Sequence, residues 1–228
     1  IYFGLDISQK TIEIFALKGE KGVFFGKISN TPKGLTEFFD KVSVPPETIT
    51  IALETGTHSA WISRQLEERG YEVIVAHARD LAFIYKGDKK SDRIDAEKLA
   101  RVARADQKLL HPVKLMDAKR QEDLLVIKAR DLLVKQRTCI INAIRGFLRS
   151  FGIDDSEYSS ETINQLYNVL SKELKQNLRG LFETLTSINT CIKNYDKRIE
   201  KIAKKYPETE TLQQIKGVGP LIALSFVL

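Results

Sequence analysis

Four acidic residues stand at positions from which their carboxylates could share metal ions. Asp6 lies at the end of the apolar run that begins at Ile1, Glu54 ends a second apolar run, and Asp92 and Asp95 are three residues apart in a helical pattern. Strands that each end in an acid place carboxylates side by side at one sheet edge, and a helix puts residues i and i+3 on one face. Clustered carboxylates repel one another unless divalent cations lie among them. The pattern therefore predicts metal-dependent phosphodiester chemistry on a nucleic acid.

Each acid also has a simpler interpretation when it is taken alone. Asp6 fits a turn, Glu54 fits a loop before a helix cap, and Asp92 and Asp95 fit the capping and charge preferences of a helix N-terminus. Their coincidence at the edges of one predicted fold favours the metal site. All-carboxylate ligation suits Mg²⁺, with Mn²⁺ as a substitute, better than Zn²⁺. Asp6, on the first strand, is the best candidate to bridge two ions.

Composition sets the broad class. With 228 residues, of which 43% are hydrophobic, the chain can form one large domain or two modest ones. Lys and Arg number 36 against 30 Asp and Glu, so a local acidic pocket in a basic chain suits a polyanion held at a metal site. Charge alone fits a basic protein without a nucleic-acid role equally well. No apolar run is long enough for a membrane span.

The cysteines indicate the compartment. Only Cys139 and Cys191 are present, far apart in the sequence, which predicts neither a disulfide framework nor a cysteine zinc site. A reducing cytosol is therefore the expected compartment, and both cysteines are expected to be small core residues of helices.

The first third of the chain has the pattern of a mixed sheet. Short apolar runs separated by Gly, Pro and Asn predict strands, and two intervening segments have helical periodicity. The strands are expected at 1–7, 11–17, 22–28, 48–53 and 71–76, and the helices at 33–42 and 58–69. This order predicts an α/β fold of the RNase H-like (RuvC-like) type, a mixed sheet with flanking helices.

Helical periodicity dominates the remainder. We expect helices at 92–105 and 117–150, separated by an extended segment over 109–115. A seven-residue apolar repeat from Val126 to Phe147, through Leu133 and Ile140, and a second stripe over 181–202 predict antiparallel coiled-coil arms of roughly 45 Å. The residues 152–155 are the expected turn between them. The sequence leaves open whether the arms pair within one chain or between subunits.

Three motifs carry a resemblance to a known family. The segments Gly4-Leu5-Asp6-Ile7-Ser8, Ala52-Leu53-Glu54-Thr55-Gly56 and Lys90-Ser91-Asp92-Arg93-Ile94-Asp95-Ala96 resemble the DEDD transposases of bacterial insertion sequences, which include Piv-type DNA invertases. The similarity continues along the long helix and reaches Gly217-Val218-Gly219-Pro220, so it covers the whole chain.

The resemblance implies an organisation and a reaction. Residues 1–108 would form a RuvC-like domain with the four acids as catalytic Mg²⁺ ligands, 109–207 the coiled-coil arms, and 208–228 the helix-hairpin-helix-like start of a carboxy-terminal transposase domain. In the family that domain carries a nucleophilic serine, and the site is shared between subunits. The serine motif is absent up to Leu228, so we expect a fragment that is inactive alone. Implied partners are DNA, a structured guide RNA used by one branch, and further copies of the chain through the coiled coil.

Basic residues suggest where a nucleic acid would bind. Four of them flank the acidic pair and four lie on the long helix away from its apolar stripe, where a solvated helix face is the competing interpretation. They are Lys86, Lys89, Lys90, Arg93, Arg130, Arg137, Arg145 and Arg149.

The predicted function is Mg²⁺-dependent DNA strand cleavage and exchange by an insertion-sequence transposase or recombinase. A RuvC-type Holliday-junction nuclease is the main alternative, since the same fold and acids serve hydrolysis. An actin-like ATPase is disfavoured because a second glycine-rich phosphate loop is missing. A non-catalytic coiled-coil module that binds nucleic acid also stays open.

Overall fold

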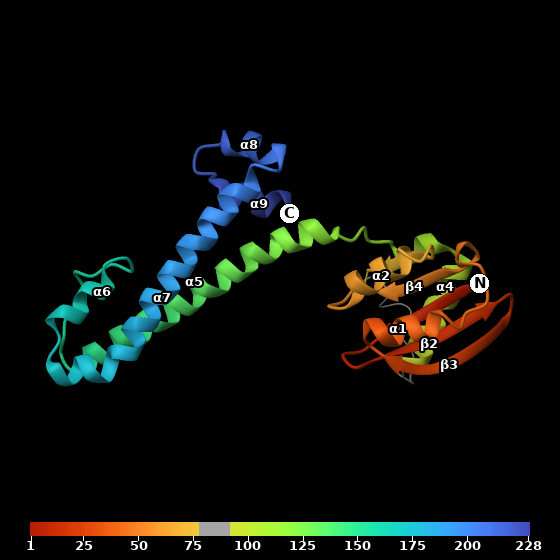
Figure 1. Cartoon of the computed structure of the whole chain (residues 1–228), viewed down its shortest axis with the longest axis horizontal. Helices are drawn as coiled ribbons and strands as arrows, with labels where there is room; N and C mark the ends of the chain where they lie inside the picture. The colour runs from red at the N-terminus through yellow and green to blue at the C-terminus, as the bar shows by residue number, and fades with distance from the viewer. Residues whose placement is uncertain (78–91) are drawn as a thin grey trace. The chain divides into compact units, whose positions relative to one another are not determined.

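The chain forms two compact units, Ile1–Met116 and Asp117–Leu228. The computed structural model describes residues 1–77 and 92–228, apart from the side chains of Asp92 and Arg93. The first unit holds the sheet and the second is helical (Figure 1). None of the helices in these described ranges is long and apolar enough to cross a membrane. The finer division of the second half at residue 208 stays a prediction.

A five-stranded mixed sheet forms the centre of the first unit. Its strands are β1 (Tyr2–Ile7), β2 (Thr11–Lys18), β3 (Lys21–Ser29), β4 (Thr50–Glu54) and β5 (Glu72–Ala76). They lie in the order β3-β2-β1-β4-β5. The first three pair antiparallel, whereas β1–β4 and β4–β5 pair parallel. The α/β fold predicted from the sequence, with an RNase H-like start, is confirmed.

The two edges of this sheet differ from an ideal ladder. In β3 the register shifts where Ile14 pairs with Gly26 and Phe15 with Phe24, so that Phe25 is an additional residue in the strand. Gly26 has a φ of 91° at this bulge, a value that glycine adopts without strain. At the other edge, Val113 N–H donates to the carbonyl of Val75 in β5 at 2.8 Å.

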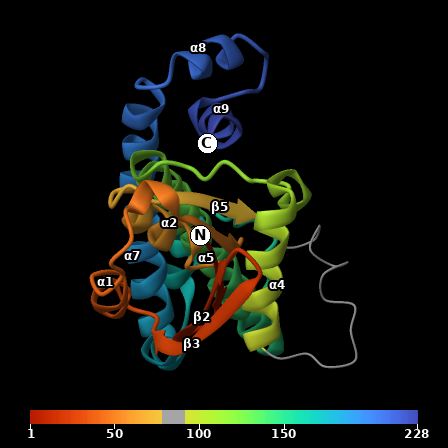
Figure 2. The same ribbon diagram turned by 90° about the vertical axis from the view of Figure 1, so that its right-hand side faces the viewer.

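Helices cover both faces of the sheet. The side chains of Leu5 and Leu53 point to one face, where they pack with Leu35 of α1 (Pro32–Phe39) and Ile62 of α2 (Ser59–Glu67). On the opposite face Ala52 packs against Leu99 of α4 (Asp92–Ala105). Figure 2 shows α1 and α4 on opposite sides of the strands. Because successive side chains of each strand point to opposite faces, the sheet contributes to two separate apolar layers.

The connection after α4 is partly helical. Residues 107–110 form a short 3₁₀ helix, η2 (Gln107–Leu110), because the Asp106 carboxylate accepts a hydrogen bond from the N–H of Lys108 at 2.9 Å. Extended structure begins only beyond it, where Pro112 forms a bridge with Ala76. The prediction of an extended segment from 109 was therefore wrong for its first two residues. A second 3₁₀ helix, η1 (Pro46–Thr48), precedes β4.

Two long antiparallel helices, α5 (Ala118–Ser150) and α7 (Lys172–Ala203), build the second unit. Near the start of α5, Val126 packs with Ile199, and near its end Leu148 packs with Leu178. The arms therefore pair within one chain. Two further helices, α8 (Pro207–Gln213) and α9 (Pro220–Val227), follow, with Leu224 of α9 in the cluster around Val126.

The predicted seven-residue seam of α5 is wrong at its end. Val126 is buried, but Phe147 is 51% exposed, and Ile144 and Leu148 take the buried positions near the end of the helix. A straight α-helix drifts by roughly 20° per heptad against a strict seven-residue repeat. Over three heptads this rotation carries Phe147 away from α7.

The connection between the arms is longer than the predicted turn. Gly152 does turn the chain, with a φ of 72°, but α6 (Ile163–Leu166) and the 3₁₀ helix η3 (Tyr167–Val169) follow before α7 begins. Ile163 and Leu166 are fully buried against the ends of the two arms. Burial of these apolar residues explains why the segment folds back as a cap.

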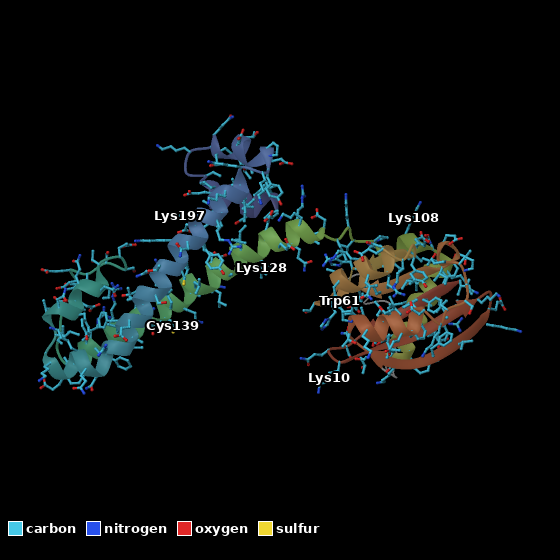
Figure 3. All side chains as sticks on the ribbon, in the orientation of Figure 1. Lys10, Trp61, Lys108, Lys128, Cys139 and Lys197 are labelled. Carbon is cyan, nitrogen blue, oxygen red and sulfur yellow. The ribbon has the colours of Figure 1, made fainter. Side chains whose placement is uncertain are left out.

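Both cysteines are exposed, so their prediction as core residues was wrong. Cys139 is labelled in Figure 3 on α5. Since a helix with one partner buries a single stripe, small apolar residues on its other faces stay in solvent.

Candidate active site

Asp6 and Glu54 lie at the same end of neighbouring parallel strands. Leu5 of β1 pairs with Leu53 of β4, and the acids are the next residues along each strand. Because successive side chains alternate, both acids are on the face opposite to the leucines. The two residues line one cavity of about 470 Å³. The structure thus brings together the two acids that follow apolar runs in the sequence.

Helix α4 crosses the sheet next to this edge and is positioned by a glycine. A Cβ at Gly4 would overlap the carbonyl oxygen of Ala96 and lie 2.8 Å from the N of Ala100. At the other end of α4, Arg104 donates to the carbonyl of Gly19, in the turn that follows Leu17, the partner of Tyr2 at the start of β1. The helix therefore runs antiparallel to β1, with its first turn at the end of the strand where Asp6 lies.

Asp95 is in that first turn and is 6% exposed. It precedes Ala96, which faces the sheet. Asp92 is the first residue of α4, one turn before Ala96, and its side chain lies outside the described part of the structure. Asp95 is thus buried on the side of α4 that covers the sheet.

The donor set fits a hard divalent cation, although the described side chains do not complete a metal site. Among the side chains described, no three carboxylate, imidazole or thiolate groups are close enough to hold a metal ion. Asp6 and Glu54 offer oxygen donors at a polar cavity, which is the ligand type that Mg²⁺ and Mn²⁺ take. The fourth acid of the predicted set, Asp92, is not among these side chains.

The loop after β4 supplies polar groups to the same cavity. Ser59 Oγ donates to the carbonyl of Gly56 at 2.8 Å, which closes the turn ahead of α2. His58 lines the cavity, and its Nδ1 accepts a hydrogen bond from Trp61 Nε1 at 3.3 Å. Trp61, labelled in Figure 3, therefore orients the imidazole.

A further acid, Glu13, was missed by the sequence analysis. It lies in β2 directly opposite Asp6, is 5% exposed, and forms an ion pair with Lys27 of β3, with Nζ 2.7 Å from Oε1. The signal in the sequence was a single charge inside the otherwise apolar run 12–17.

The predicted nucleic-acid contacts fall into two groups. Lys86, Lys89 and Lys90 lie outside the described residues, as does the side chain of Arg93. Those on α5 are described. Arg130 Nε lies 2.9 Å from the Oδ1 of Asp196 in α7. This ion pair joins the two arms of one chain.

Arg145 and Arg149 both contact the buried carboxylate of Asp155, at 3.0 Å and 2.8 Å. The Arg149–Asp155 contact is a hydrogen bond, and it raises the pKa of the arginine. For Arg137, proximity to Glu161 helps to lower the pKa of that carboxyl group, after the larger effect of a hydrogen bond from Ser159. These arginine side chains thus interact with acids of the second unit itself. Their binding of nucleic acid stays a prediction.

Comparison with known proteins gives one family. A family model described as a transposase, of the DEDD and IS110 type, matches residues 3–153. The transposase for insertion sequence element IS1111A of Coxiella burnetii is 32% identical over 149 residues, covering 62% of this chain and 40% of the relative. A putative transposase of Sinorhizobium fredii, y4pF/y4sB, is 29% identical over 227 residues, with coverages of 97% and 56%.

A third relative, the probable family 20 transposase of Pseudomonas aeruginosa, is 24% identical over 228 residues and is covered to 65% of its length. The chain thus spans less than two thirds of each of these relatives.

Proposed function

Because this chain belongs to the DEDD transposase family of insertion sequences, we propose that its sheet unit is the metal-dependent centre for DNA strand cleavage and exchange. The observation that supports this most directly is the shared cavity of Asp6 and Glu54 at adjacent strand ends. The buried Asp95 and the first residue of α4, Asp92, are the other two ligands in the proposal.

The four acids have distinct tasks in this proposal. Asp6, on the central strand β1, would be the central ligand, and Glu54, Asp92 and Asp95 would supply the remaining carboxylate oxygens. Mg²⁺, or Mn²⁺ in its place, would supply an activated oxygen and neutralise charge on the leaving group. The burial of Asp95 and the close approach of α4 to Gly4 support this assignment, because they hold the first turn of α4 beside β1.

The proposal extends to partners of the whole protein. The names of the relatives refer to transposases and insertion sequences, and the substrate proposed for this chain is accordingly DNA. A structured guide RNA, association of copies through the helical arms, and a catalytic serine beyond Leu228 complete the proposal. The protein would act in the bacterial cytoplasm at the nucleoid. The 228-residue chain alone would then bind metal but would not exchange strands.

Asp6→Asn and Glu54→Gln in the full-length protein test the assignment. Removing a residue that only hydrogen-bonds to a metal ligand lowers metal affinity or activity by about 10–100-fold. Removing a ligand itself should therefore reduce strand exchange by at least about 100-fold. Calorimetric titration with Mn²⁺ should show the matching loss of binding. Glu37→Gln, on the exposed surface of α1 across the sheet, is the control and should leave both unchanged.

Normal strand exchange by Asp6→Asn would refute the catalytic assignment. The products also separate the reaction types. Strand exchange through a serine predicts a covalent protein–DNA adduct, whereas free DNA ends without an adduct would identify a hydrolytic nuclease.

A further inference from the structure

Four charged residues form a row across the sheet at one level. Lys27 of β3 pairs with Glu13 of β2, and Glu13 pairs with Asp6 of β1. Glu54 of β4 continues the row, because it follows Leu53, the partner of Leu5. The face is the one that α4 covers, since Phe15 and Leu17, which alternate with Glu13 along β2, pack on Ala96 and Ala100. From β3 to β4, the row therefore consists of one lysine followed by three acidic residues.

Glu13 is the most constrained member of this row. Its side chain is only 7% exposed, whereas that of Lys27 is 56% exposed. A buried carboxylate is costly unless a cation accompanies it, and acids directly opposite each other on neighbouring strands destabilise the sheet. Lys27, at 2.7 Å, supplies the cation on one side of Glu13, and Asp6 lies on the other side. A purely structural role gives no reason to place a second acid beside Asp6.

We propose that Glu13, held by Lys27, is a positioning residue that strengthens divalent-cation binding at Asp6 and Glu54. This inference rests on the proposed function, since it presumes that those two acids are metal ligands. Glu13 adds negative potential from a low-dielectric position directly beside Asp6, which favours a dication. Lys27 acts in two ways: it keeps Glu13 in place in the absence of metal, and its own charge opposes the cation.

The two members of the pair therefore have opposite expected effects. Glu13→Gln should weaken Mn²⁺ binding by about 10-fold or more, in the range seen for outer-shell partners. Lys27→Met should tighten Mn²⁺ binding, and Mn²⁺ should raise its unfolding temperature by more than it raises that of the original chain. Glu13→Asp keeps the charge and should bind more tightly than Glu13→Gln.

The measurement is calorimetric titration of the 228-residue chain with Mn²⁺, paired with thermal unfolding with and without the ion. Lys33 and Glu37 provide a matched control, since they form an exposed pair on α1 with Nζ 3.7 Å from Oε1. Lys33→Met and Glu37→Gln should leave the Mn²⁺ affinity unchanged.

The outcomes separate this inference from the proposed function. Absence of Mn²⁺ binding by the original chain would refute the metal site itself. Binding by the original chain and equally by Glu13→Gln would refute only the role of Glu13, as would weaker binding by Lys27→Met. Should Glu13→Gln fail to fold, the tighter binding expected of Lys27→Met decides the question alone.

Discussion

Gly4 has no side chain, and this allows α4 to approach β1 closely beside Asp6. A Cβ would meet the backbone of Ala96 and Ala100, which cannot move aside as the end of a flexible side chain can. Gly4→Ala should therefore lower the free energy of unfolding by about 1–3 kcal/mol through overpacking. Urea denaturation measures the change.

Gly146→Ala is the matched control for this prediction. Gly146 lies in α5 with open space around its Cβ position, so alanine should raise the stability by about 0.5–1 kcal/mol. A Gly4→Ala protein as stable as the original would show that α4 can shift on the sheet without cost.

Tyr206 gives the second unit a dependence on alkaline pH. Its hydroxyl donates to Asp123 Oδ2 at 2.9 Å, and both residues are buried. The pKa of Tyr206 is raised above its usual value of 10.0. Burial is the largest cause, and the hydrogen bond to Asp123 is the second. Because the pKa is higher in the folded state, the stabilising contribution is complete below pH 10 and is lost as the pH rises through the folded pKa.

Thermal unfolding between about pH 8 and pH 12 should show this loss in the original chain and a smaller one in Tyr206→Phe. At pH 8 that variant should be less stable by about 1–3 kcal/mol, since a buried carboxylate loses its donor. Tyr167→Phe, which removes a hydroxyl at the other end of the unit, should keep the alkaline loss.

At the scale of elements, local patterns predicted most of the fold. Short apolar runs and period-2 alternation identified all five strands. The acids near the end of β1 and at the end of β4 could be predicted to share an edge because parallel strands end together. The ion pair of Glu13 was not predictable, since pairing between β2 and β3 depends on a bulge that the sequence only hints at with Gly26. The burial of Phe147 was mispredicted because a local repeat ignores accumulated helical drift.

The tip of the helical arms, where residues 151–171 connect α5 to α7, is held together by contacts to the buried acid Asp155. Asp155 receives ion pairs from Arg145 and Arg149, and Arg145 Nη2 also donates to the carbonyl of Tyr158 at 2.7 Å. Asp155→Asn should destabilise the tip by about 1.5–3 kcal/mol, the usual worth of hydrogen bonds to charged groups. Hydrogen exchange of the amides of Ile163 and Leu170 should accelerate.

Glu157→Gln serves as the comparison, since Glu157 is exposed in the same connection. Unchanged exchange in Asp155→Asn would mean that apolar burial around Leu166 holds the tip by itself.

At the scale of the whole molecule, two separate cores predict two unfolding events. Leu185 is fully buried in α7, and Leu185→Ala should cost about 2–5 kcal/mol. Calorimetry should show the loss in one transition, that of Asp117–Leu228, while the transition of Ile1–Met116 and its Mn²⁺ shift stay unchanged. A single cooperative transition would contradict the division into units.

The treatment of the sheet edges has a consequence for assembly. An exposed edge can recruit a strand from another molecule and lead to fibrous aggregation. Here the extra residue Phe25 forms a bulge in the edge strand β3, where it pairs with β2, and residues 112–113 pair with Ala76 and Val75 at the end of β5. We therefore expect the sheet unit to resist this route to aggregation.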